Sequence, residues 1–160
     1  MKHKVHFSTL TDEWKTPESL FNKLNKEFEF NFDPCPLAKS FDGLKIDWGL
    51  RNFCNPPYSQ LKAWCKKGYE EYLKGKLVVM LIPSRTDTIA WHDYCMKATE
   101  IRFIKGRVKF GNSKNSAPFP SAIVIFRPPH PGEWLNFLET VLDGNKARIN
   151  QLKEFLNKEA

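Results

Sequence analysis

The chain has 160 residues, enough for one domain with a hydrophobic core and too few for two complete domains. A hydrophobic content of 41% and an aromatic content of 14% exclude a disordered chain. With 25 lysine and arginine residues against 18 acidic residues, the net charge is +7, which favours a polyanionic partner such as nucleic acid, although many basic proteins bind nothing acidic.

Cysteine spacing and hydropathy narrow the class of protein further. Cys35, Cys54, Cys65 and Cys95 form no C-x-x-C pair, so neither a zinc ribbon nor a thioredoxin-type motif is supported, and we expect buried thiols and no metal site. The N-terminal residues lack the apolar core of a signal peptide, and no apolar run approaches membrane-spanning length. We therefore expect a cytoplasmic protein with no membrane partner.

The first predicted element is a helix over residues 17–28. Residues 1–13 before it are polar, and we expect them to be loosely held. Thr16 is a suitable N-cap, and Pro17 suits the first helical position. Leu20, Phe21, Leu24 and Phe28 follow at helical spacing, so the helix is expected to cover a sheet.

Two short strands are predicted next, each followed by an acid. The first, over residues 30–33, ends at Asp33, and the second, over residues 44–47, ends at Asp47. Ligands bind at the carboxyl ends of strands in α/β sheets, so Asp33 can accept hydrogen bonds from ribose hydroxyls; a cap or turn acid is equally open. Asp47 with Trp48 either receives a cofactor's amino group and rings or is a turn acid beside a core tryptophan.

The stretch Asn55-Pro56-Pro57-Tyr58 follows a further short strand. Two consecutive prolines cannot continue a strand, because each lacks a backbone N–H, so the chain leaves the sheet as a rigid extended loop. The Asn55 side chain and the carbonyls of Asn55 and Pro56 offer oxygen acceptors, and Tyr58 offers a flat ring. These groups suit a planar ligand with an amino group, such as adenine. The alternative is a plain proline turn with Tyr58 in the core.

The rest of the chain completes the sheet. A helix over 60–73 precedes an apolar strand over 77–82, which we expect to be central and parallel, with Arg85 just beyond its carboxyl end. A short helix near 89–95, a strand over 101–104, a second strand or hairpin from 106 to 110 and a buried strand over 121–126 follow.

These elements define the expected domain organisation. Residues 14–127 form the main domain, and residues 128–160 form a helical hairpin that packs on the domain or supports self-association. Helices and strands alternate from residue 17 to about residue 95, which argues for an α/β fold with a mostly parallel sheet and an antiparallel edge hairpin.

Several motifs together carry a family resemblance. In order, these are Thr16-Pro17, Asp33-Pro34-Cys35, Asp42-Gly43-Leu44, Asp47-Trp48, Asn55-Pro56-Pro57-Tyr58-Ser59, Ile82-Pro83-Ser84, Gly106-Arg107-Val108-Lys109-Phe110 and Pro118-Phe119-Pro120-Ser121. The series resembles the phage-type DNA N-6-adenine methyltransferase family of bacteriophages and prophages, over residues 14 to about 127. The Asn-Pro-Pro-Tyr stretch alone also resembles enzymes that methylate protein glutamine and some RNA methyltransferases.

The resemblance implies a Rossmann-like sheet and transfer of a methyl group from S-adenosylmethionine to the N6 amine of adenine in DNA. It implies that Asn55, Pro56 and Tyr58 form the base socket. Cofactor contacts are implied for Thr16, Pro17, Asp33 and Asp47. The glycine-rich cofactor turn of many methyltransferases is absent, and Pro34-Cys35-Pro36-Leu37 stands in its place.

Cations near the predicted loops are candidate DNA contacts. Arg107, Lys109 and Lys114, with Lys105, surround the loop over 111–117, and Arg85 lies beyond the apolar strand; a solvated hairpin is the alternative. The short chain leaves little room for a separate target-recognition domain, so any sequence readout must come from loops or from a second subunit in a homodimer. The competing hypotheses are a methyltransferase acting on protein glutamine or RNA, and a DNA-binding module without catalysis.

Overall fold

The computed structural model describes residues 15–38, 40–111, 115–129 and 133 of the chain. The chain divides after Arg127 into two units, and the fold described below is that of the first unit, Met1–Arg127. The predicted loose N-terminal segment, the C-terminal helical hairpin and Lys114 lie outside the described residues. None of the helices in the described ranges has the length and apolar character that crossing a bilayer requires.

The centre of this unit is a four-stranded sheet of order β1-β2-β4-β3. Strand β1 (Arg51–Cys54) pairs in parallel with β2 (Leu77–Pro83), whereas β4 (Ser121–Phe126) pairs antiparallel with both β2 and β3 (Glu100–Phe103). The sheet is therefore mixed rather than mostly parallel as predicted, since one of these three pairings is parallel. The expected antiparallel edge is present, formed by β3 and β4.

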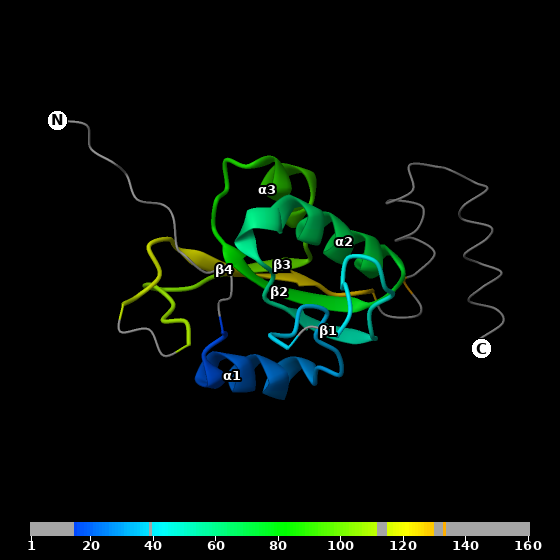
Figure 1. Ribbon diagram of the computed structural model, residues 1–160. Coiled ribbons are helices and arrows are strands. Elements are labelled where there is room, and N and C mark those ends of the chain that lie inside the picture. The colour runs from blue at the N-terminus through cyan, green and yellow to red at the C-terminus, as the bar shows by residue number, and fades with distance from the viewer. Residues whose placement is uncertain (1–14, 39, 112–114, 130–132, 134–160) are drawn as a thin grey trace. The chain divides into compact units, whose positions relative to one another are not determined.

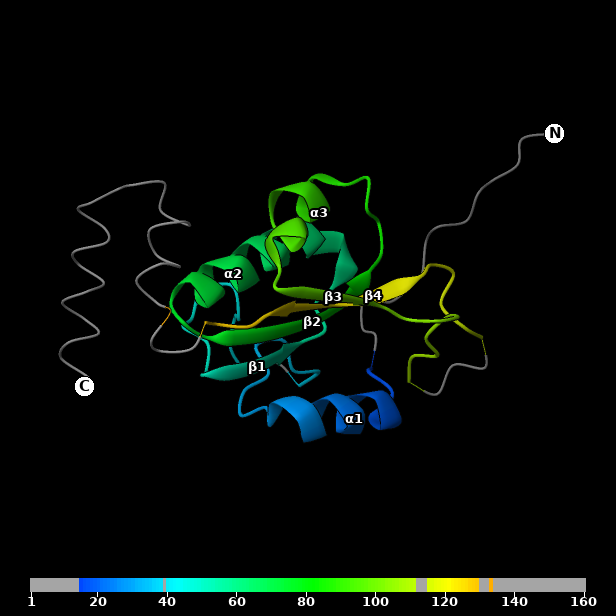
Figure 2. The ribbon, with the colours of Figure 1, turned by 180° about the vertical axis from the view of Figure 1, so that it is seen from behind.

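Helices cover both faces of the sheet, which gives three layers (Figure 1). Helix α1 (Glu18–Phe28) lies on one face, and α2 (Leu61–Leu73) and α3 (Ile89–Asp93) lie on the other, an arrangement that is also clear from behind (Figure 2). Short 3-10 turns, η1 (Tyr58–Gln60) and η2 (Cys95–Lys97), precede α2 and follow α3. The helices predicted over 17–28, 60–73 and 89–95 and the buried strands β2 and β4 are confirmed to within a residue or two.

The hydrophobic core explains why β2 is central. All residues of β4 and all but the first of β2 are buried, because helices cover both faces of these strands. Leu24 and Phe28 of α1 belong to the same buried cluster as Phe53 of β1. On the other face, a Cβ atom at Gly68 of α2 would lie 2.9 Å from the Met80 sulfur, so glycine lets this helix approach β2 without displacing the Met80 side chain.

One predicted strand is reduced to a single bridge, and another is replaced by a turn; at both places a side chain accepts a backbone N–H. Near residues 30–33, only a single parallel bridge joins Phe32 to Asn52, and the Asn31 side-chain oxygen accepts the N–H of Arg51 at 3.0 Å. Residues 44–47 form a turn instead of a strand. There the Asp42 carboxylate accepts the backbone N–H of Leu44 at 3.1 Å, a local bond that competes with strand pairing.

The predicted strand over residues 106–110 is also wrong. Gly106 has a φ of +80°, which turns the chain away from the line of β3. The segment nevertheless has the alternating burial of a strand: Val108 and Phe110 are buried, while Arg107 and Lys109 are exposed. It is an extended arm that packs on the core, and the Val108 carbonyl accepts the N–H of Ala117 at 2.8 Å.

Candidate active site

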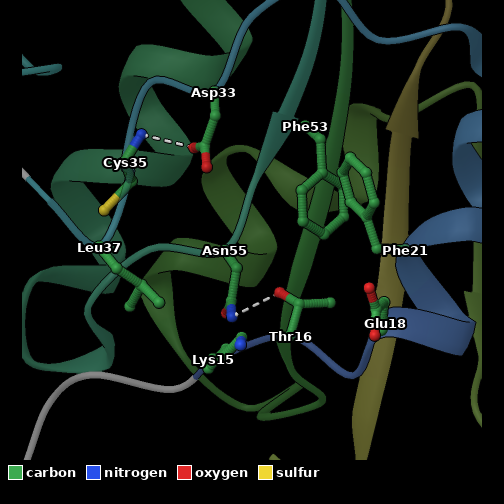
Figure 3. Close-up of a pocket in the computed structure, with 9 residues that line it drawn as sticks. All are labelled: Lys15, Thr16, Glu18, Phe21, Asp33, Cys35, Leu37, Phe53 and Asn55. Atoms are coloured by element: carbon green, nitrogen blue, oxygen red, sulfur yellow. Dashed lines mark hydrogen bonds between the residues drawn. The ribbon is translucent and has the colours of Figure 1, made fainter. Parts of the chain in front are cut away.

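A pocket of about 250 Å³ opens at the carboxyl end of β1 (Figure 3). Its residues come from the start of α1, from the loop after Phe32, and from β1 with the residue that follows it: Lys15, Thr16, Glu18, Phe21, Asp33, Cys35, Leu37, Phe53 and Asn55. The fold thus brings together three of the residues singled out from the sequence, Thr16, Asp33 and Asn55. Pro17, Pro56 and Tyr58 adjoin these residues along the chain without lining the pocket.

The Asn55 side chain stands at the edge of the pocket with both ends of its amide engaged. Its Nδ2 donates a hydrogen bond to the Thr16 hydroxyl at 3.0 Å, and its Oδ1 accepts one from the Tyr58 hydroxyl at 3.1 Å. The predicted N-cap role of Thr16 is wrong, because Pro17 occupies the cap position and no side chain caps α1. The Thr16 hydroxyl is instead directed to Asn55, 39 residues further along the chain (Figure 3).

Tyr58 lies in the core beneath this amide, with only 9% of its surface exposed. Its ring meets those of Phe119 and Phe110 edge-on, with centroids 5.4 Å and 6.3 Å away. Burial raises the pKa of Tyr58 well above its ordinary value, so the hydroxyl stays protonated and can donate to Asn55. The part of Tyr58 that reaches the pocket edge is thus its hydroxyl, and its ring is largely covered.

Asp33 forms the acidic side of the pocket. One carboxylate oxygen accepts the backbone N–H of Cys35 at 2.8 Å, which closes a tight turn. The residue remains open to solvent, but the concave surroundings desolvate its carboxylate and raise its pKa, an effect that the Cys35 hydrogen bond opposes. The carboxylate is therefore available to a ligand that donates hydrogen bonds.

Gly43 fixes the position of the turn after Asp33. A Cβ atom at Gly43 would lie 1.9 Å from the Pro34 carbonyl oxygen and 2.9 Å from the Trp64 ring, so no larger residue fits there. The Gly43 carbonyl also accepts the indole N–H of Trp48 at 2.7 Å. The turn at Asp42-Gly43 thus supports the wall of the pocket from behind.

The chemistry of the pocket lining suits S-adenosylmethionine. Phe21 and Phe53 form an aromatic wall, with ring centroids 5.2 Å apart, against which an adenine ring can pack. Asp33 and Glu18 offer carboxylates to ribose hydroxyls and to cationic groups, and Lys15 offers a cation to a carboxylate. The volume is somewhat below the range of about 300–1,000 Å³ usual for small-molecule sites, so part of the cofactor would extend over the rim.

Asp47 does not line the pocket. Its carboxylate is exposed and pairs with Lys74, just beyond the end of α2, at 2.5 Å. That ion pair borders a polar cluster around Glu71, whose side chain is fully buried and accepts hydrogen bonds from Lys67, Lys74, Lys76 and the Trp48 backbone. Asp47 and Trp48 thus lie beside the start of β2, at the end of the sheet opposite Asn55.

Of the candidate DNA contacts, Arg85 contacts an aromatic ring next to Tyr58. Its guanidinium group sits 5.8 Å from the centroid of the Phe119 ring, which in turn contacts Tyr58. Arg107 and Lys109 are exposed on the extended arm, whose Phe110 also contacts Tyr58. Arg85 thus contacts one of the aromatic rings that pack on Tyr58, and Arg107 and Lys109 lie close in the chain to the other.

The comparison with known families decides the assignment. Residues 5–136 match the model described as DNA N-6-adenine-methyltransferase (Dam). The chain belongs to the Dam family. No curated protein and no solved structure matches the chain.

Membership of the Dam family indicates an enzyme with DNA N-6-adenine methyltransferase activity. Methyltransferases of this family generally use S-adenosylmethionine, and the match includes every residue that lines the pocket. In the described part of the chain, no group of three or more histidine, cysteine, aspartate or glutamate side chains is placed to hold a metal ion.

Several residues of the Dam-family pocket were not foreseen from the sequence. Lys15 and Glu18 flank the Thr16-Pro17 motif, and this position is the sequence feature that could have identified them as pocket residues. Phe21 and Phe53 carry the helical and strand periodicity of core residues, and nothing in the pattern distinguishes a pocket wall from a core contact. Phe119 lies in the Pro118-Phe119-Pro120-Ser121 motif, but its contact with Tyr58 joins residues far apart in the chain.

Proposed function

We propose that this member of the Dam family methylates the N6 amine of adenine in DNA at the Asn55 edge of the pocket. The observation that carries the proposal is the placement of the Asn55 amide, which borders a pocket containing Asp33 and is held from both ends. An amide oxygen at that boundary can accept a hydrogen bond from an amine and orient it towards a group in the pocket.

We propose that the sheet is a Rossmann-like methyltransferase sheet. The parallel β1–β2 pair and the position of the pocket at the carboxyl end of β1 support this, because ligands bind at that end of the strands in open α/β sheets. The order of motifs in the sequence supports a place among the phage-type members of the family, and hence a phage or prophage origin.

The cofactor site is proposed to be the pocket itself. Asp33 would accept hydrogen bonds from ribose hydroxyls, and Phe21 and Phe53 would pack against the adenine ring of S-adenosylmethionine. Thr16, which lines the pocket and accepts a hydrogen bond from Asn55, and Pro17 beside it would flank the cofactor. When bound, the cofactor supplies a methyl group on a sulfonium centre, which passes to nitrogen while sulfur keeps the electron pair of the broken bond.

The chain's own contribution to the reaction is orientation. The Asn55 oxygen and the Pro56 carbonyl would accept the two hydrogens of the amine, which draws the nitrogen lone pair out of conjugation with the ring. The amine proton can leave to solvent after transfer, so no strong general base is needed. Tyr58 acts in this site through its hydroxyl, because its ring is buried against Phe110 and Phe119.

DNA would approach from the side of Arg85, Arg107 and Lys109. A target adenine in a duplex must leave the stack to reach Asn55, at a cost of a few kcal/mol. Phe119 is only partly buried and lies between the Arg85 guanidinium and Tyr58, so it offers an aromatic surface to an extruded base. Phosphate contacts by the three cations would add a sequence-independent attraction.

A labelled-methyl transfer assay tests this function directly. The enzyme is incubated with S-adenosylmethionine carrying a tritiated methyl group and with DNA, RNA or a glutamine-containing protein in separate reactions. The proposal predicts label in DNA alone, recovered as N6-methyladenine after hydrolysis. Label in RNA or protein but not in DNA would overturn the substrate assignment, and DNA binding without S-adenosylmethionine binding would indicate a non-catalytic module.

A further inference from the structure

The chemical role of Asn55 depends on which end of its amide faces the substrate. The torsion that rotates an asparagine amide is broad, and a half-turn exchanges the oxygen for the NH2 group. Only the oxygen can accept a hydrogen bond from an adenine amine; the NH2 group would oppose it with donors of its own. An enzyme that uses this amide therefore needs groups that restrain its torsion.

We propose that Thr16 and Tyr58 are positioning residues that restrain the Asn55 amide beside the amine to be methylated. This inference rests on the proposed function of Asn55. Thr16 accepts from Nδ2 at 3.0 Å on one side, and Tyr58 donates to Oδ1 at 3.1 Å on the other. An amide oxygen accepts up to two hydrogen bonds, so the Tyr58 hydroxyl need not leave when the substrate amine binds.

The backbone holds Thr16 firmly enough for this role. The carbonyl of Pro17, the next residue, accepts the N–H groups of Leu20 and Phe21 at 3.1 Å and 3.0 Å, which ties the segment to the first turn of α1. On the other side, the carbonyl of Lys15 accepts the N–H of Gly111 at 2.8 Å. The backbone of Thr16 is thus held on both sides, which fixes the position of its hydroxyl relative to the Asn55 amide.

Packing holds Tyr58 equally well. Pro56 and Pro57 set the backbone before it, and its ring lies among Phe110, Phe119 and the residues of the α1-side core. A phenol buried in this way stays protonated, so it presents a donor to the amide oxygen throughout the working pH range. The amide torsion of Asn55 is therefore restrained by a hydroxyl group on each side.

The kinetic test compares Thr16→Val with Thr16→Ser. Valine keeps the shape but removes the hydroxyl, and we expect kcat at saturating S-adenosylmethionine and DNA to fall about five- to tenfold, the effect of one lost hydrogen bond. The KM for S-adenosylmethionine should change less than about twofold. Thr16→Ser should restore kcat, and Ser19→Ala, which removes an exposed hydroxyl from the adjoining helix α1, should leave it unchanged.

Two results would overturn the proposal. An unchanged kcat with a raised KM for S-adenosylmethionine in Thr16→Val would make Thr16 a cofactor contact only. Equal kcat values for Thr16→Val and Thr16→Ser would show that the hydroxyl is irrelevant. Activity retained in Asn55→Ala would instead contradict the proposed function itself, so the two failures are distinguishable.

Tyr58→Phe and a spectroscopic readout test the other half of the proposal. Tyr58→Phe removes the donor without changing the ring, and kcat should fall by a similar factor. The side-chain NH2 signals of Asn55, identified by their loss in Asn55→Ala, should shift in Thr16→Val and in Tyr58→Phe but not in Ser19→Ala. Signals that stay unchanged in both variants would show that neither residue holds the amide.

Discussion

Substitution of Glu71 by glutamine is expected to destabilise the protein in a way that depends on pH. Glu71 is fully buried on α2 and accepts hydrogen bonds from Lys67 at 2.7 Å, Lys74 at 2.8 Å and Lys76 at 2.5 Å, and from the Trp48 backbone. Burial by itself would raise the pKa of Glu71, but these hydrogen bonds together outweigh it and lower the pKa from 4.5 to about 2. Glutamine keeps the shape and loses the charge.

The size and sign of the effect follow from the two pKa values. A fall from 4.5 in the unfolded chain to about 2 in the folded protein corresponds to about 3 kcal/mol of stability. Because the folded-state pKa is the lower one, this contribution is complete above pH 4.5 and is lost as the pH falls towards 2. We therefore expect Glu71→Gln to cost about 3 kcal/mol at pH 7 and much less near pH 2.

Urea denaturation across this pH range measures the difference. The matched control is Glu70→Gln, since Glu70 is the next residue on the same helix, is about half exposed, and approaches Lys66 only to 3.8 Å. An exposed pair of this kind contributes about 0–1 kcal/mol, so this control should be nearly neutral. A Glu71→Gln protein as stable as the wild type at pH 7, or a difference that does not shrink below pH 4.5, would refute the reasoning.

Three further predictions concern the pocket and the DNA surface. Gly43→Ala should destabilise the protein by about 2 kcal/mol or more, because the added methyl group meets a backbone carbonyl, whereas Gly106→Ala, with open space but a φ of +80°, should cost about 1 kcal/mol; thermal melting compares them. Asp33→Asn should weaken S-adenosylmethionine binding in calorimetry. In the wild type, affinity should fall as the pH drops through the raised pKa of Asp33, which lies above 3.8, and this dependence should vanish in the variant. Arg85→Ala should weaken DNA binding and reduce the slope of log binding constant against log salt concentration by about one, while Lys66→Ala on α2 should change neither. Equal slopes for the wild type and Arg85→Ala would contradict a phosphate contact by Arg85.

Much of the fold could be predicted from periodicity alone. Helices α1 and α2 and the buried strands β2 and β4 carry strong apolar patterns, and their observed bounds agree with the predicted ones to within a residue or two. The short strands differ: β1 and β3 are expected from the sequence, whereas the strands predicted over 30–33 and 44–47 are reduced to a single bridge and replaced by a turn. Asn31 and Asp42 use their side chains to capture backbone N–H groups, and a four-residue pattern does not show that competition.

Residues of the candidate site could be predicted only where a sequence motif contains a functional group suited to ligand binding. Asn55 and Asp33 stand at the pocket because each follows a short extended segment, as the sequence indicates. Asp47 resembles Asp33 in sequence context, yet it pairs with Lys74 at the other end of the sheet. The contact between Thr16 and Asn55 depends on how α1 docks against β1, which no local pattern reveals.

Methyl transfer by Asn55→Ala tests the central claim most directly. The variant is assayed with DNA and labelled S-adenosylmethionine, beside Asn22→Ala, which truncates an exposed asparagine on α1. The account predicts a loss of at least about 100-fold in kcat, with S-adenosylmethionine still bound and with Asn22→Ala unaffected. Near-normal transfer of methyl groups to adenine by Asn55→Ala would contradict the role of this amide.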